Sequence, residues 1–143
     1  MAGLHPMAAV ATAAFVMAAF SLTFAAGCSK PDEYAAVRGQ VLYNNEPLGQ
    51  GVVMFQPAAG PPARGTIQSD GTFELETVDR GAGARIGTNR VRNSARELPK
   101  NYDTEVGLGK TLIPLRYNDI ATSGLTAEVQ GDSNEPFVFH LKD

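Results

Sequence analysis

Cys28 is the only cysteine of this 143-residue chain, and it stands where an almost wholly apolar segment meets a polar one. The segment from Met7 to Gly27 contains no charged residue, and Ser29-Lys30-Pro31-Asp32-Glu33 follows Cys28 directly. A thiolate is a strong nucleophile that can take a diacylglyceryl group. Because the chain has no second cysteine, it cannot form an internal disulfide. Acylation of Cys28 is therefore the first chemistry that the sequence predicts.

The apolar segment favours a cleaved lipoprotein signal. Ala25-Ala26-Gly27 before the cysteine resembles a bacterial lipobox, the site where lipid is added and the signal is cut. A signal has an apolar region of about 7–15 residues and a membrane-spanning helix needs about 20, so the length alone does not decide. Alanine, serine and threonine dilute the segment and disfavour a stable span. An uncleaved anchor and an ordinary cleaved signal stay as alternatives, because Ala25 replaces the usual leucine and residues 1–6 contain no lysine or arginine.

A second candidate site is a short basic stretch. It holds six of the twelve lysine and arginine residues, against two carboxylates, Asp79 and Glu97. The six are Arg80, Arg85, Arg90, Arg92, Arg96 and Lys100. The stretch favours a solvated sheet edge whose charge discourages pairing with another sheet. The alternative is that Arg85, Arg90 and Arg92 contact an anionic glycan, lipid headgroups or an acidic protein.

The rest of the sequence favours neither catalysis nor metal binding, so we expect no enzyme and no cofactor. A catalytic nucleophile needs a nearby base, and the only histidine after Cys28 is His140, which the strand pattern places on an outward face. Zinc needs three or four His, Cys or carboxylate ligands. Calcium at Asp70 or Asp132 is conceivable, but aspartate is common in turns for backbone reasons. A net charge of −3, carried wholly after the apolar segment, argues against nucleic acid.

The elements that must position these residues are β-strands. Apolar and polar residues alternate, or form short apolar runs, in segments bounded by turn residues. The predicted strands are 37–43, 51–56, 65–68, 72–77, 85–93, 125–130 and 137–142. Residues 94–124 show no clear hydrophobic periodicity, and we predict that they form a long irregular connection with one helical turn. The last two strands are expected to form a hairpin about the turn at 131–134.

About seven short strands indicate a small antiparallel β-sandwich or barrel. The predicted core anchors are Phe55, Phe73, Phe137 and Phe139, because buried aromatic rings dominate small cores. The predicted organisation is a signal peptide at 1–27, a lipid-anchored tether at 28–36 and one β-domain at 37–143.

Several short motifs follow one another in a characteristic order along the predicted β-domain. They are Val37-Arg38-Gly39-Gln40-Val41, Pro47-Leu48, Gly51–Pro57, Ser69–Thr77, Pro114-Leu115-Arg116-Tyr117 and Thr122–Thr126. This set, which covers residues 37 to 141, resembles the carboxypeptidase regulatory-like domains of planctomycete lipoproteins. The resemblance implies a prealbumin-like (transthyretin-like) β-sandwich without catalytic residues. One departure is Asn89, which stands where the family motif has an aromatic residue.

These observations together predict a non-enzymatic lipoprotein of the bacterial cell envelope. It would be held on the membrane through Cys28, on the outer rather than the inner membrane because Ser29 follows the cysteine. The domain would act as a structural or interaction module, with an envelope protein or a glycan as its partner. A carbohydrate- or small-ligand-binding module is the main alternative, although the chain lacks tryptophan for a sugar platform. A hydrolase of transthyretin-like fold is the least supported reading.

Overall fold

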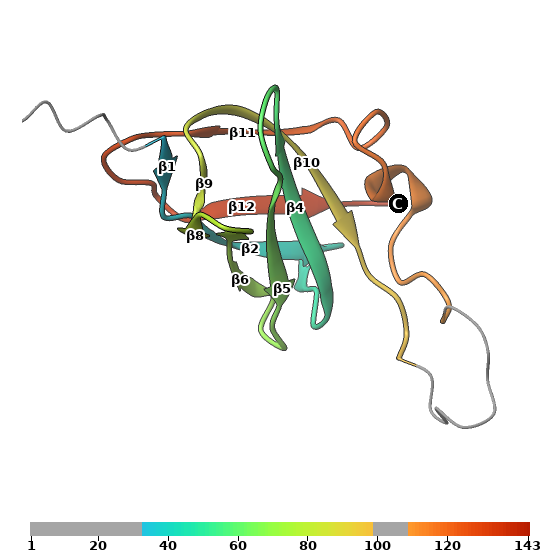
Figure 1. Ribbon diagram of the computed structural model, residues 1–143. Coiled ribbons are helices and arrows are strands. Elements are labelled where there is room, and N and C mark those ends of the chain that lie inside the picture. Colours follow the sequence, from blue (N-terminus) through green and yellow to red (C-terminus); the bar gives the residue numbers. More distant parts are fainter. Residues whose placement is uncertain (1–32, 99–108) are drawn as a thin grey trace, which may run out of the picture.

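The computed structural model describes residues 33–98 and 109–143, and these residues form an all-β sandwich (Figure 1). The predicted small antiparallel β-sandwich is confirmed. The six longest strands are β2 (Arg38–Tyr43), β4 (Gly51–Pro57), β5 (Ala63–Ile67), β10 (Gly87–Ser94), β11 (Leu125–Val129) and β12 (Phe137–Leu141). The short strands are β1 (Tyr34–Ala35), β3 (Glu46–Pro47), β6 (Thr72–Glu74), β7 (Glu76–Thr77), β8 (Gly81–Ala82) and β9 (Ala84–Arg85). The predicted helical turn is the 3-10 helix η1 (Leu115–Asn118).

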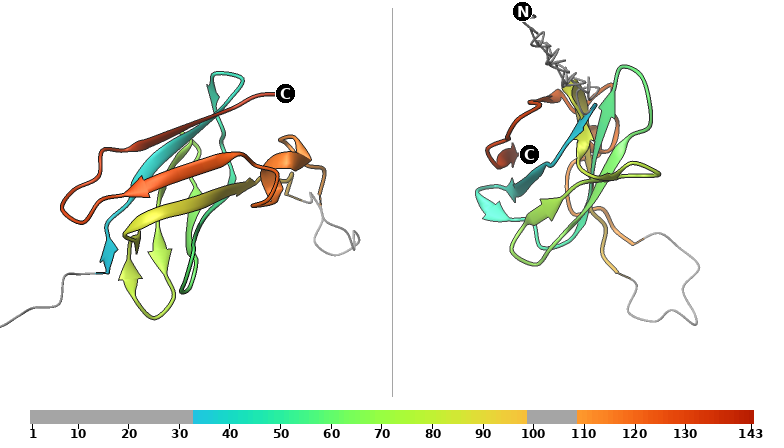
Figure 2. Two further views of the ribbon diagram at one scale, coloured as in Figure 1. Left: turned by 90° about the horizontal axis from the view of Figure 1, so that it is seen from above. Right: turned by 60° about the vertical axis from the view of Figure 1, so that its left-hand side comes forward.

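Two sheets form the layers of the sandwich. The larger sheet has the strand order β11-β10-β4-β5-β7-β8, and the smaller has the order β12-β2-β3 with β6 also paired to β2. Figure 2 (left) shows β2 and β12 on one side and β10 and β11 on the other. A separate pair, β1 with β9, lies at the end of the sandwich opposite η1 (Figures 1 and 2). The folded part therefore includes Tyr34 and Ala35, which precede the domain boundary expected at Val37.

The sheets are joined at a corner inside the predicted strand 72–77. Its first half, β6, pairs with β2, and its second half, β7, pairs with β5. The break falls at Leu75, whose backbone N–H donates to the carbonyl oxygen of Val37 at 2.9 Å. Phe73, Leu75 and Thr77 are buried while Glu74 and Glu76 are exposed, so the predicted alternation continues through the break. One extended segment thus passes from one layer to the other without changing its buried face.

The predicted hairpin between the last two strands is wrong. Strand β11 pairs antiparallel with β10, whereas β12 pairs parallel with β2 in the other sheet. The connection between β11 and β12 therefore crosses from one layer to the other. Both strands bury alternate residues as expected, but alternation identifies only the buried face of a strand and not its neighbour.

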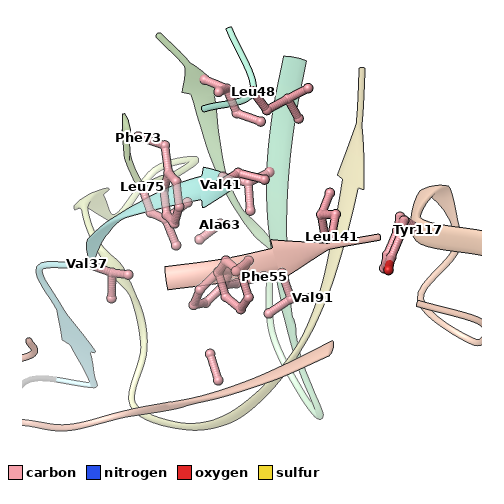
Figure 3. Packing of buried hydrophobic residues seen from close by; sticks show 14 of the residues in the cluster. Val37, Val41, Leu48, Phe55, Ala63, Phe73, Leu75, Val91, Tyr117 and Leu141 are labelled. Atoms are coloured by element: carbon pink, nitrogen blue, oxygen red, sulfur yellow. The ribbon is translucent and has the colours of Figure 1, made fainter. Parts of the chain in front are cut away.

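Aromatic rings from both layers meet in the core (Figure 3). The Phe55 ring on β4 has its centroid 5.7 Å from that of Phe137, 5.9 Å from Phe139 and 6.4 Å from Phe73. Phe55, Phe73 and Phe139 are buried and Phe137 is half-buried. The predicted core anchors are confirmed, and they bridge the two sheets.

Two asparagines are also fully buried on β10. The amide nitrogen of Asn89 donates to the carbonyl oxygens of Arg85 at 2.8 Å and Gly87 at 3.0 Å. The side chain therefore turns back on its own strand where the resembled family has an aromatic ring. For Asn93, neither amide atom has a hydrogen-bond partner among the described residues. The inward face of β10 therefore carries two polar side chains in the core of the domain.

Candidate functional site

Of the predicted site residues, Cys28 lies outside the described residues. The described part of the chain begins at Glu33, close to it in sequence. The carbonyl oxygen of Glu33 accepts a hydrogen bond from the backbone N–H of Ile86 at 2.9 Å. The chain is thus fixed to the domain five residues after the cysteine.

Arg90 and Arg92 lie on the outward face of β10. The alternate residues Asn89, Val91 and Asn93 are buried, so both arginines project from the sheet on the same side. Arg90 is exposed and Arg92 is half-buried. Residues two positions apart on a strand are separated by about 7 Å. The side chains of Arg90 and Arg92 therefore form one basic surface.

The Arg92 guanidinium is held in place by its neighbours. Its Nε lies 3.2 Å from the sulfur of Met54, the residue opposite Arg92 on β4. Its Nη1 donates to the carbonyl oxygen of Asn118 in η1 at 3.2 Å. Because these contacts use only part of the guanidinium, Arg92 keeps N–H donors for an anion in a fixed orientation. Arg90, which is exposed, adds a second positive charge beside it.

Arg85 is not part of this surface. Its Nη1 donates to the carbonyl oxygen of Ala59 at 2.9 Å, in the loop that follows β4. Arg92 instead lies beside Met54 in the middle of β4, so the two guanidinium groups contact different segments of the chain. The structure brings together two of the three predicted arginines and places the third, Arg85, on β9 opposite Tyr34 of β1.

Arg64 is the arginine that the sequence analysis missed. It lies on β5 opposite Met54, and its neighbours Ala63 and Gly65 are buried, so Arg64 also points outward. Arg64 and Arg92 therefore flank Met54 on one face of the sheet, about 10 Å apart. The predicted strand began two residues too late, at Gly65, although Ala63, Gly65 and Ile67 already carried the alternation. We call Arg64, Arg90 and Arg92 the arginine face.

An open groove of about 1260 Å³ is lined by Arg64, but not by Arg90 or Arg92, and follows the corner between the sheets. Its walls carry Arg38 opposite Glu74 and Arg64 opposite Glu76, each pair on neighbouring strands. Val52 and Val138, which are 42% and 50% exposed, contribute apolar surface. Basic and acidic side chains therefore face each other across neighbouring strands in this groove, and Arg64 of the arginine face stands opposite Glu76.

Near the end of β12, a polar cluster ties the chain to the body of the domain. The Tyr43 hydroxyl donates to the Asp143 carboxylate, which also accepts from the amide nitrogen of Asn44 at 3.0 Å. These bonds, the one from Tyr43 first, lower the pKa of Asp143, and the same carboxylate raises the pKa of Tyr43. The cluster is exposed and holds the chain after β12 against the end of β2, so we assign it a structural role.

His140 is exposed on the outward face of β12, as the strand pattern predicted. No group of three His, Cys, Asp or Glu side chains with metal-binding geometry occurs among residues 33–98 and 109–143. None of the helices in that part of the chain is long and apolar enough to cross a membrane.

Comparison of the chain with family models, with curated proteins and with solved structures finds no match.

Proposed function

We propose that this chain is a non-enzymatic lipoprotein of the bacterial cell envelope, anchored to the membrane through Cys28. The observation that carries the proposal is the order of segments along the chain. An uncharged apolar run ends at the only cysteine, and a folded β-sandwich begins at Glu33. The resemblance of residues 37 to 141 to the carboxypeptidase regulatory-like domains of lipoproteins supports the same proposal.

A lipid on Cys28 would hold one end of the sandwich close to the bilayer. Five residues span at most about 18 Å, and Glu33 is bonded to Ile86 beside the β1–β9 pair. The β1–β9 end would therefore face the membrane, and η1 would face away from it. In this orientation the domain serves as a structural or interaction module, and Ser29 after the cysteine favours the outer membrane.

Replacing Cys28 by alanine is expected to abolish lipid labelling and membrane retention. The reason is that only a thiolate can take the diacylglyceryl group, and stable anchoring requires two or more acyl chains. The measurement is incorporation of a labelled fatty acid into the full chain, with Ser29→Ala as the control that leaves the thiol in place. Globomycin, which blocks lipoprotein signal cleavage, should leave a longer precursor. Full labelling of Cys28→Ala would refute the proposal.

A second candidate function, binding of an anionic glycan, is favoured by the arginine face. Three guanidinium groups project from β10 and β5, the strands on either side of β4, and one of them is held in place by Met54 and Asn118. Guanidinium groups bind carboxylate and sulfate-like anions with charge-assisted hydrogen bonds.

The double replacement Arg90→Ala and Arg92→Ala is expected to weaken binding to sulfated or carboxylated glycans by at least about tenfold, because charge-assisted hydrogen bonds are lost. A glycan array followed by titration at two salt concentrations measures the effect. Arg85→Ala is the matched control, because Arg85 lies away from the arginine face and should leave binding unchanged. Equal binding by the double variant and the native chain would exclude this function.

A further inference from the structure

The outer edge of β12 has no strand partner among the described residues. In its sheet β12 is the terminal strand, paired on one side with β2. Figure 2 (left) shows it at the border of its layer, outside β2. An edge strand presents backbone N–H and C=O groups that another strand can pair with.

The parallel ladder determines which residues of β12 present these groups outward. The carbonyl oxygen of Leu141 accepts from the backbone N–H of Asn44 at 3.0 Å, so Leu141 directs its backbone groups toward β2. In a strand, successive residues direct these groups to opposite edges. Phe137 and Phe139 therefore also bond toward β2, and Val138, His140 and Lys142 direct their N–H and C=O groups to the outer edge.

One end of this outer edge is already closed. The backbone N–H of Lys142 donates to the Tyr117 hydroxyl at 3.0 Å, and the same hydroxyl donates to the carbonyl oxygen of Lys142 at 3.2 Å. That carbonyl also accepts from Arg116, whose guanidinium lies 4.6 Å from the centroid of the Tyr117 ring. Helix η1 thus satisfies the edge groups of Lys142 and stops any ladder at this point.

At the other end of the outer edge, a proline limits further strand pairing. Pro136 precedes β12 and is the next residue whose backbone would face the outer edge, but proline has no N–H to donate. Four backbone groups remain open between the two ends: the N–H and C=O of Val138 and of His140. No hydrogen bond from these four groups to another described residue occurs outside the strand ladder.

We propose that β12 pairs antiparallel with β12 of a second copy of this chain, on a two-fold axis at Phe139. In this register Val138 stands opposite His140 of the second copy, and the four open groups of each copy bond to those of the other. Pro136 stands opposite Lys142 of the second copy, so the position without a donor meets the position that is already satisfied. The strand is therefore complementary to itself.

Other registers satisfy fewer of these groups. A shift that places Val138 on the axis sets His140 opposite the donor-less Pro136 of the second copy. A shift that places His140 on the axis sets Val138 opposite Lys142, which Tyr117 and Arg116 already occupy. The side chains also permit the pairing, because Phe137–Leu141 contains no lysine, proline or acidic residue that would block an edge. This inference does not depend on acylation of Cys28.

Cysteine pairs test the register directly. The variant carrying both Val138→Cys and His140→Cys is expected to form disulfide-linked dimers under mild oxidation of the detergent-extracted full chain. Positions directly opposite in an antiparallel pair have Cα atoms about 5.5 Å apart, within reach of a disulfide. Each single variant should stay at the level of the native chain, because Val138 and its own copy are diagonal neighbours about 7–8 Å apart. Cross-linking of the single variants as strong as that of the double variant would overturn the register.

A proline variant tests the edge itself. Val138→Pro removes an N–H that faces outward and leaves the bonds to β2 intact, so the monomer should stay folded. Two of the four intermolecular hydrogen bonds are lost, and the dimer dissociation constant in sedimentation analysis should rise about thirtyfold. Val138→Thr keeps the N–H and the branched shape and is the matched control. A native chain that sediments as a monomer, or a Val138→Pro variant that dimerises like the native chain, would contradict the proposal, and so would an outer edge occupied by a strand of a different protein.

Discussion

Replacing Phe55 by alanine is expected to lower the free energy of unfolding by about 3–5 kcal/mol. The Phe55 ring is fully buried and touches the rings of Phe73, Phe137 and Phe139, so its loss leaves a cavity between the two sheets. Chemical denaturation of the native chain and the variant, followed by circular dichroism, measures the difference.

Two controls separate the cavity from other effects of the substitution. Phe55→Leu keeps most of the apolar volume and should cost less than about 1.5–2 kcal/mol. Val78→Ala removes apolar atoms from a side chain that is 72% exposed and should change stability by less than about 0.5 kcal/mol. If Phe55→Ala were as stable as Val78→Ala, the aromatic cluster would not be the centre of the core.

Gly83→Ala is expected to cost about 2–4 kcal/mol of folding free energy. Gly83 has a φ of +105°, and an added Cβ would lie 2.0 Å from the carbonyl oxygen of Ala35 on β1. The added atom would therefore force β1 away from β9 at the end of the sandwich opposite η1. Thermal or chemical unfolding measures the loss.

Gly81 offers a matched control two residues earlier. Its φ is +87°, yet nothing lies within 4 Å of an added Cβ. Gly81→Ala should carry only the backbone strain of a left-handed residue, about 1–2 kcal/mol. Equal losses for the two alanine variants would show that the close approach of Ala35 to Gly83 is not tight in solution.

The alternation of apolar and polar residues predicted the strands and their buried faces. It placed Phe73 and Leu75 inward and His140 outward, and the structure agrees. These properties follow from local geometry, because successive side chains of a strand point to opposite faces. Turn residues were equally informative: Asn44 and Asn45 have φ values of 49° and 68°, which asparagine tolerates better than most residues.

The pairing of strands could not be predicted in the same way. Val129 and Phe137 are close in sequence, yet β11 and β12 belong to different sheets, because partner choice depends on contacts between distant segments. The arginine face shows the same limit. Arg90 and Arg92 share a strand and were found by their spacing, whereas Arg64 joins them only through the register of β4 with its two neighbours.

Asn89 shows how a local motif can change without changing the fold. The resembled family motif has an aromatic residue at this inward position. Here the amide nitrogen donates to the carbonyl oxygens of Arg85 on β9 and Gly87 on β10, and the amide oxygen has no partner among the described residues. The burial of a polar side chain was not predicted, because polar residues in a strand pattern are normally assigned to the exposed face.

Mass spectrometry of the mature protein's first peptide tests the lipoprotein proposal most directly. We predict that the chain recovered from membranes begins at Cys28 and carries the added mass of a diacylglyceryl group. Recovery of residues 1–27 still attached to an unmodified Cys28 thiol, in a soluble fraction, would contradict the proposal.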